Sequence, residues 1–119
     1  MEQLPVYDMT FQIRVADFEA GSTWYEALLR RSPDFIPHDD FIEWELIKGC
    51  WLQLAKGEPA IGSGPLRFGV SDIEKERQRI ISELGVEVSE VYTREGVPVK
   101  WCTFDDPFGN RLGFYQHLD

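Results

Sequence analysis

Apolar and polar residues alternate along several short stretches of the chain, a pattern typical of half-buried strands. The first stretch covers residues 9–15, where apolar Phe11 and Ile13 alternate with polar Gln12 and Arg14. The same reasoning predicts further strands at residues 34–38, 41–47, 50–56, 65–70, 86–94, 98–105 and 111–117. Two other stretches, residues 18–30 and 73–84, repeat their apolar positions at helical spacing. The pattern therefore predicts an α+β chain with two helices.

Both predicted helices have local signals at their ends. Asp17 is a candidate N-cap for the first helix, and a Ser-Pro dipeptide ends it. Ser71 and Glu74 form an S-x-x-E capping box before the second helix, and Gly85 ends that helix.

The order of these elements repeats. A β-α-β-β-β series is followed by a Gly-rich joint at residues 57–64 and then by a second β-α-β-β-β series. Residues 15–19 and 70–74 share the form V-small-D-apolar-E at the same strand-to-helix junction, which supports an internal repeat. We therefore predict one domain over residues 1–119, built from two modules at about residues 8–56 and 65–117.

Composition narrows the class of protein. The 119 residues suit one domain, and 43% hydrophobic residues are enough for a core. The net charge of −9 argues against nucleic acid and anionic membranes as partners. No apolar run reaches the length of a membrane span, and no signal peptide is visible. Two cysteines make no disulfide framework, so we expect a cytoplasmic protein.

Four motifs resemble the vicinal oxygen chelate superfamily, which includes glyoxalase I, extradiol dioxygenases, fosfomycin resistance enzymes and bleomycin-binding proteins. They are IRVAD at residues 13–17, WYEALL at 24–29, FGVSD at 68–72 and DPFGN at 106–110. The resemblance implies two βαβββ modules that form an open, cleft-containing mixed β-barrel with the helices outside. It also implies a homodimer. In the helix motif, Arg30 stands where the family usually has glycine.

The resemblance also shows where metal-dependent members place their ligands. Those positions fall on Thr10, Gln53, Pro65 and Gly113 of this chain. Proline and glycine offer no side-chain donor, and a metal site needs about three donors or more. We therefore expect no metal and no other cofactor.

Strand alternation divides the side chains between a face for the helices and a face for a ligand. Trp24 and Trp44 are predicted to be structural, whereas two other tryptophans fall on the ligand face. Flat aromatic walls with a few polar groups are typical of small-molecule sites. The candidate ligand-binding residues are Gln12, Arg14, Trp51, Gln53, Arg67, Trp101, Thr103 and Tyr115.

The charged residues of this face have two interpretations. Arg14 and Arg67 either bind a carboxylate or phosphate of a ligand or form structural ion pairs with nearby carboxylates. We favour the structural interpretation for Arg14 and leave Arg67 open. Glu43 and Glu45 could form an acid–base pair, but charges that protect an edge strand from aggregation are the favoured interpretation.

Three functions remain open at this point. The favoured hypothesis is a metal-free protein that binds a small aromatic compound or an antibiotic. The alternative is a metal-dependent lyase, isomerase or dioxygenase with displaced ligands. The third is an interaction module whose exposed aromatic residues contact another protein. Whether the chain is an enzyme is left open.

Overall fold

The structure is a computed structural model that describes residues 3–60 and 64–118. Part of the predicted Gly-rich joint, residues 61–63, lies outside the described residues. The chain divides into two compact units, unit 1 at residues 1–59 and unit 2 at residues 60–119, which are described separately. Within the described residues, the element order is β-α-β-β-β in unit 1 and β-α-β-β in unit 2.

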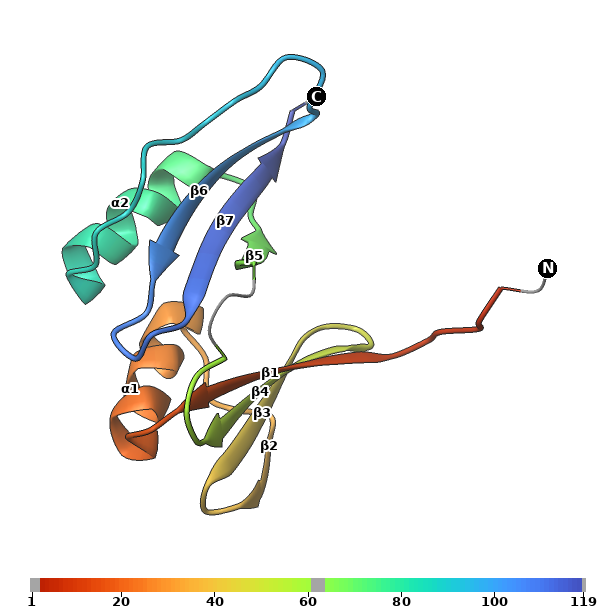
Figure 1. Cartoon of the computed structure of the whole chain (residues 1–119), viewed down its shortest axis with the longest axis vertical. Coiled ribbons are helices and arrows are strands. Elements are labelled where there is room, and N and C mark those ends of the chain that lie inside the picture. Colours follow the sequence, from red (N-terminus) through yellow and green to blue (C-terminus); the bar gives the residue numbers. More distant parts are fainter. Residues whose placement is uncertain (1–2, 61–63, 119) are drawn as a thin grey trace. The chain divides into compact units, whose positions relative to one another are not determined.

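Unit 1 is a four-stranded mixed sheet with one helix (Figure 1). Its strands follow the order β1-β4-β3-β2, with β1 parallel to β4 and the other pairs antiparallel. The predicted boundaries of β1, β3 and β4 are confirmed. The elements of unit 1 are β1 (Met9–Val15), α1 (Phe18–Leu29), β2 (Phe35–His38), β3 (Phe41–Ile47) and β4 (Cys50–Lys56).

The core of unit 1 lies between α1 and one face of its sheet, because alternate strand residues all point to that side. Trp44 is completely buried there, and its indole Nε1 donates a hydrogen bond of 3.0 Å to the carbonyl oxygen of Arg31. The structural role predicted for Trp44 is confirmed. The other large buried side chains of unit 1 are Ile13, Val15, Tyr25, Leu28, Ile42, Leu52 and Leu54.

Helix α1 has a hydrogen-bonded N-terminal cap and a strained C-terminal cap. The Asp17 carboxylate accepts a 3.1 Å hydrogen bond from the amide of Ala20, which confirms the predicted N-cap. At the other end, Arg30 takes the left-handed conformation with φ of 55°. Glycine usually fills this position because a Cβ atom is crowded there. The arginine at this family glycine position therefore carries local strain.

We expect Arg30→Gly to raise the free energy of unfolding by about 0.5–1 kcal/mol. The substitution relieves the left-handed strain but makes the unfolded chain more flexible, so the gain is smaller than the strain itself. Urea denaturation followed by far-UV circular dichroism measures the change. A lower midpoint for Arg30→Gly than for the wild type would contradict this account of the C-cap.

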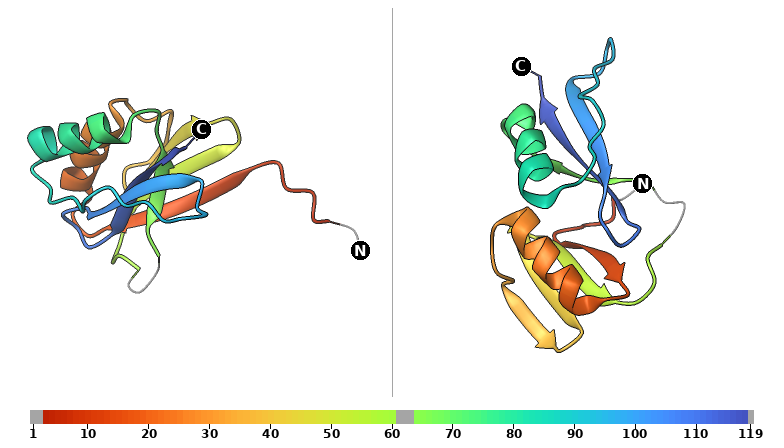
Figure 2. Two further views of the ribbon diagram at one scale, coloured as in Figure 1. Left: turned by 90° about the horizontal axis from the view of Figure 1, so that it is seen from above. Right: turned by 90° about the vertical axis from the view of Figure 1, so that its left-hand side faces the viewer.

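Unit 2 is a three-stranded mixed sheet with one helix. The strand order is β5-β7-β6, with β5 parallel to β7 and β6 antiparallel to it. Helix α2 runs alongside this sheet (Figures 1 and 2). The elements are β5 (Leu66–Gly69), α2 (Ile73–Leu84), β6 (Val99–Asp105) and β7 (Arg111–His117). Its buried apolar side chains are Ile73, Ile80, Cys102, Phe104, Leu112 and Phe114.

The turn between β6 and β7 is fixed by one buried carboxylate. Asp106 accepts hydrogen bonds of 2.8 Å from the backbone amides of Phe108 and Asn110 and from the Asn110 side chain. Three donors satisfy the buried charge, so the D-P-F-G-N sequence specifies this turn through Asp106.

The predicted cap of α2 is wrong by one residue. Asp72, not Ser71, is the N-cap, and its carboxylate accepts a 3.1 Å hydrogen bond from the amide of Lys75. A carboxylate at this position also meets the positive end of the helix dipole, which a serine hydroxyl does less well. Gly85 caps the C-terminus of α2, as predicted.

The strand predicted at residues 86–94 is also wrong. This segment runs alongside β6 (Figure 1). It pairs with β6 through isolated bridges, from Val88 to Phe104 and from Tyr92 to Trp101. Val88 and Tyr92 are four residues apart, whereas their partners on β6 are only three apart. The segment therefore has one extra residue, which bulges out of register. The Ser89 hydroxyl takes the place of a backbone acceptor for the amide of Thr103.

Candidate functional site

Unit 1 carries a chain of polar side chains on the sheet face opposite the buried residues. The strand register aligns Gln12 of β1 with Gln53 of β4, and Gln53 with Glu43 of β3. Gln12 Nε2 lies 3.5 Å from Gln53 Oε1, and Gln53 Nε2 donates a 2.8 Å hydrogen bond to Glu43 Oε1. At the other end, Arg14 Nε donates to Gln12 Oε1 at 3.0 Å.

This chain of hydrogen bonds gives every amide a fixed orientation. A cation stands at one end and a carboxylate at the other, and each amide donates toward the carboxylate. The predicted residues Gln12, Arg14 and Gln53 are therefore brought together. Their remaining donors and acceptors form an ordered polar surface across three strands.

Glu43 belongs to this surface, although the sequence interpretation placed it at an edge. That interpretation is wrong, because β3 lies between β4 and β2 inside the sheet. Glu45 accepts a hydrogen bond from the amide of Gly49 and so supports the turn between β3 and β4. A regular hairpin with a two-residue turn at Lys48-Gly49 would pair Gln53 with Trp44. The register irregularity between Glu45 and Ile47 instead pairs Gln53 with Glu43.

Trp51 supplies the aromatic part of this face. It lies on β4, paired with Thr10 of β1 on one side and Glu45 of β3 on the other. The side chain is half-buried, so part of its ring is open to a ligand.

Unit 2 presents a second polar and aromatic face, centred on Arg67. Arg67 of β5 and Thr103 of β6 both pair with Gly113 of the strand between them. The Arg67 guanidinium crosses over Gly113, and its Nη2 donates a 3.1 Å hydrogen bond to Thr103 Oγ1. A Cβ atom at position 113 would lie 2.9 Å from Arg67 Cγ and would overlap the Cys102 carbonyl oxygen. Glycine at position 113 therefore leaves the room that Arg67 needs to reach Thr103.

Two aromatic residues complete the second face. Tyr115 pairs with Gly69 of β5 and with Trp101 of β6. Its ring covers Gly69, where a Cβ atom would lie 2.9 Å from Tyr115 Cζ. Trp101 contacts Tyr92, with ring centroids 6.4 Å apart. The predicted set of Arg67, Trp101, Thr103 and Tyr115 thus shares one face of unit 2.

The opposite face of β6 carries Cys102, which is completely buried. Burial disfavours the thiolate and raises the pKa of Cys102 above its usual value. This result agrees with the predicted division of β6 between a buried face and a ligand face. Cys102 is consequently an inert thiol.

The residues at the superfamily's metal positions do not fit a metal ion. Gln53 is bonded on both sides by other side chains, and Thr10 is a weak ligand. Pro65 and Gly113 have no donor, and the Arg67 side chain covers Gly113. In neither unit do the described residues bring three His, Cys, Asp or Glu side chains together as a metal site.

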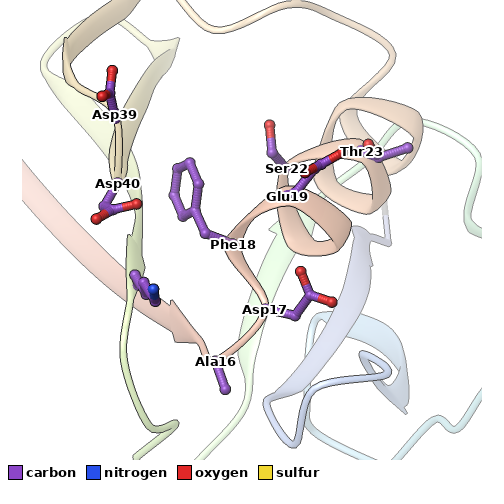
Figure 3. Close-up of a pocket in the computed structure, with 9 residues that line it drawn as sticks. Ala16, Asp17, Phe18, Glu19, Ser22, Thr23, Asp39 and Asp40 are labelled. Carbon is purple, nitrogen blue, oxygen red and sulfur yellow. The ribbon is translucent and has the colours of Figure 1, made fainter.

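A separate depression of about 750 Å³ lies in unit 1, between the start of α1 and the turn after β2 (Figure 3). Phe18 is the aromatic residue of its lining, and Asp39 and Asp40 face it across the opening. None of the predicted site residues lines it. The full lining is Ala16, Asp17, Phe18, Glu19, Ser22, Thr23, Asp39, Asp40 and Lys56.

Fold and side chains together define a class of protein: an α+β chain of two helices and two mixed sheets, each with a polar and aromatic face. Among solved structures, a glyoxalase/bleomycin resistance protein from Catenulispora acidiphila is 28% identical, with a TM-score of 0.73 over 92% of this chain and 96% of that one. A glyoxalase-related enzyme from Clostridium phytofermentans is 19% identical, with a TM-score of 0.71 over 99% and 100%. A lactoylglutathione lyase from Agrobacterium tumefaciens is 14% identical, with a TM-score of 0.74 over 96% of each chain.

The similarity to the Catenulispora acidiphila protein supports the vicinal oxygen chelate superfamily, which the sequence motifs indicated. No family model and no curated protein matches the sequence. The two less similar structures support the fold alone. Among the described residues, no helix has the length and apolar character needed to cross a membrane.

Proposed function

We propose that this protein binds a small aromatic molecule without a metal ion, on the polar and aromatic sheet faces of its units. One observation carries the proposal: at Gly113, where metal-dependent relatives place a ligand, the guanidinium of Arg67 crosses the strand and bonds to Thr103. A basic side chain therefore covers this ligand position.

The aromatic residues of the two faces support this proposal. Trp51 in unit 1 and Trp101 in unit 2 are both half-buried, and each stands beside fixed polar groups. An aromatic wall supplies apolar contact, and a few oriented hydrogen-bonding groups supply selectivity. The glyoxalase/bleomycin resistance protein from C. acidiphila makes bleomycin a reasonable first compound to test.

Calorimetric titration tests the proposal with three probes of different charge: cationic bleomycin, neutral 1-naphthylmethanol and anionic 1-naphthoate. We expect at least one of them to bind at one molecule per chain or per face. Replacing Trp51 or Trp101 by alanine should weaken binding roughly tenfold or more, since a stacked aromatic contact contributes about 1–3 kcal/mol.

Trp24→Phe is the matched control, because Trp24 lies on α1 and not on either face. It should bind the probes as the wild type does. Failure of all three probes to bind would overturn the proposal. Equal binding by Trp51→Ala, Trp101→Ala and Trp24→Phe would place the ligand away from these faces and would overturn it as well.

The alternative of a metal-dependent lyase, isomerase or dioxygenase predicts a requirement for metal, which chelation tests.

We also propose that the chain forms a homodimer. Light scattering coupled to size exclusion measures its mass directly, and a mass near the 13.8 kDa of a single chain would contradict a dimer.

A further inference from the structure

We propose that the molecule bound on unit 2 carries a carboxylate, that Arg67 is the group that recognises it, and that its aromatic ring lies against Tyr115 and Trp101. This inference rests on the proposed function and adds the chemical class of the ligand.

Among the described residues, no carboxylate forms an ion pair with Arg67. Its one hydrogen bond in the described part of the chain goes to the neutral hydroxyl of Thr103. Its Nε is completely buried and has no acceptor there. A partly buried charge that lacks an opposite charge is costly, and a bound carboxylate would remove that cost.

Three other arginines of unit 2 have acceptors of their own. Arg77 donates to the carbonyl oxygens of residues 88 and 89, and Arg79 pairs with Glu76. Arg111 pairs with Asp105, one of the carboxylates that a structural role for Arg67 would have used. The structural interpretation of Arg67 therefore loses that partner, and the ligand-binding interpretation is favoured.

The surroundings of Arg67 hold its guanidinium in place. Its stem lies over Gly113, and Thr103 fixes Nη2. Within the described residues, Nη1 has no hydrogen-bond partner. An arginine whose orientation is already fixed loses less entropy when it binds a carboxylate, so the contact is stronger than one to a mobile side chain.

The aromatic residues lie two positions along their strands from the residues that hold Arg67. Tyr115 is two positions beyond Gly113 on β7, and Trp101 is two positions from Thr103 on β6. Two residues along a strand span roughly 7 Å. A ligand with a carboxylate on a single or fused aromatic ring matches that separation between cation and aromatic wall.

The charge distribution also favours an anion in this unit. Residues 1–59 contain 5 Lys+Arg and 11 Asp+Glu, whereas residues 60–119 contain 7 and 10. Unit 2 is therefore the less acidic part of a strongly acidic chain, and a carboxylate meets less repulsion there.

The test compares 1-naphthoate with 1-naphthylmethanol by calorimetric titration of the wild type, Arg67→Gln, Arg67→Lys and Arg111→Gln. The two probes share a ring system and differ in charge. We expect the wild type to bind 1-naphthoate about tenfold or more tightly than the alcohol, since a hydrogen bond to a charged group contributes that much. Arg67→Gln should abolish this preference, because it removes the charge that distinguishes the two probes.

Arg67→Lys keeps the charge but loses the planar fork, so it should retain a weakened preference. Arg111→Gln removes the same charge from an exposed position of the same sheet and should behave as the wild type. Equal wild-type affinity for the two probes would overturn the inference and leave the proposed function standing. Binding of neither probe nor of bleomycin would overturn both. A carboxylate preference that survives in Arg67→Gln would refute the assignment to Arg67.

Discussion

Replacing Trp44 by alanine is expected to lower the free energy of unfolding by about 4 kcal/mol. The side chain is completely buried between α1 and the sheet of unit 1, so its removal leaves a cavity. It also leaves the carbonyl oxygen of Arg31 without the indole donor at 3.0 Å. Urea denaturation followed by far-UV circular dichroism measures this change and does not depend on tryptophan fluorescence.

Two control variants separate the contributions. Trp44→Phe keeps much of the volume and loses the indole N–H, so we expect a cost between that of alanine and zero. Tyr7→Ala removes an aromatic ring that is 92% exposed, and its cost should stay below about 0.5 kcal/mol. Equal costs for Trp44→Ala and Tyr7→Ala would show that Trp44 is not a core residue.

Replacing Gly113 by alanine adds only one methyl group. Per atom added, we expect it to lower the stability of unit 2 more than any other substitution. The new Cβ would overlap the backbone carbonyl oxygen of Cys102 and would lie 2.9 Å from Arg67 Cγ. A flexible side chain could move aside, but a carbonyl in the paired strand cannot move without shifting β6. We expect a loss of about 3 kcal/mol in the free energy of unfolding, measured by the same urea denaturation.

Gly64→Ala is the matched control for this variant. Among the described residues, no atom lies within 4 Å of a Cβ atom at position 64, so we expect a change close to zero. Gly113→Ala should also displace Arg67 from Thr103. A variant as stable as Gly64→Ala would contradict the described packing of Arg67 over Gly113.

Local patterns predicted most of the fold. The strand boundaries of β1, β3 and β4 follow from simple alternation. One face of β3 and of β4 is largely buried, whereas in β1 only Ile13 and Val15 are buried. The segment at residues 86–94 has the same alternation but does not form a strand. There, a bulge and the Ser89 hydroxyl interrupt the pairing with β6, and alternation cannot reveal this.

The sequence predicted which sheet face each candidate site residue occupies, but not which of these residues contact one another. Alternation assigned Gln12, Gln53 and Arg67 to the open faces of their strands. The hydrogen bonds that join them depend on the register between strands distant in sequence, which a single sequence does not supply. Glu43 was missed for that reason, and the contact between Arg67 and Thr103 required knowing that Gly113 lies between them.

The most direct test of metal-free binding combines metal analysis with titration of one sample. Protein purified without chelator is analysed for bound metals and titrated with 1-naphthoate, and the titration is repeated after dialysis against EDTA. Our account predicts no metal at a level near one per chain, and the same affinity before and after dialysis. One equivalent of zinc, nickel, manganese or iron, with binding that disappears on chelation and returns with that metal, would contradict it.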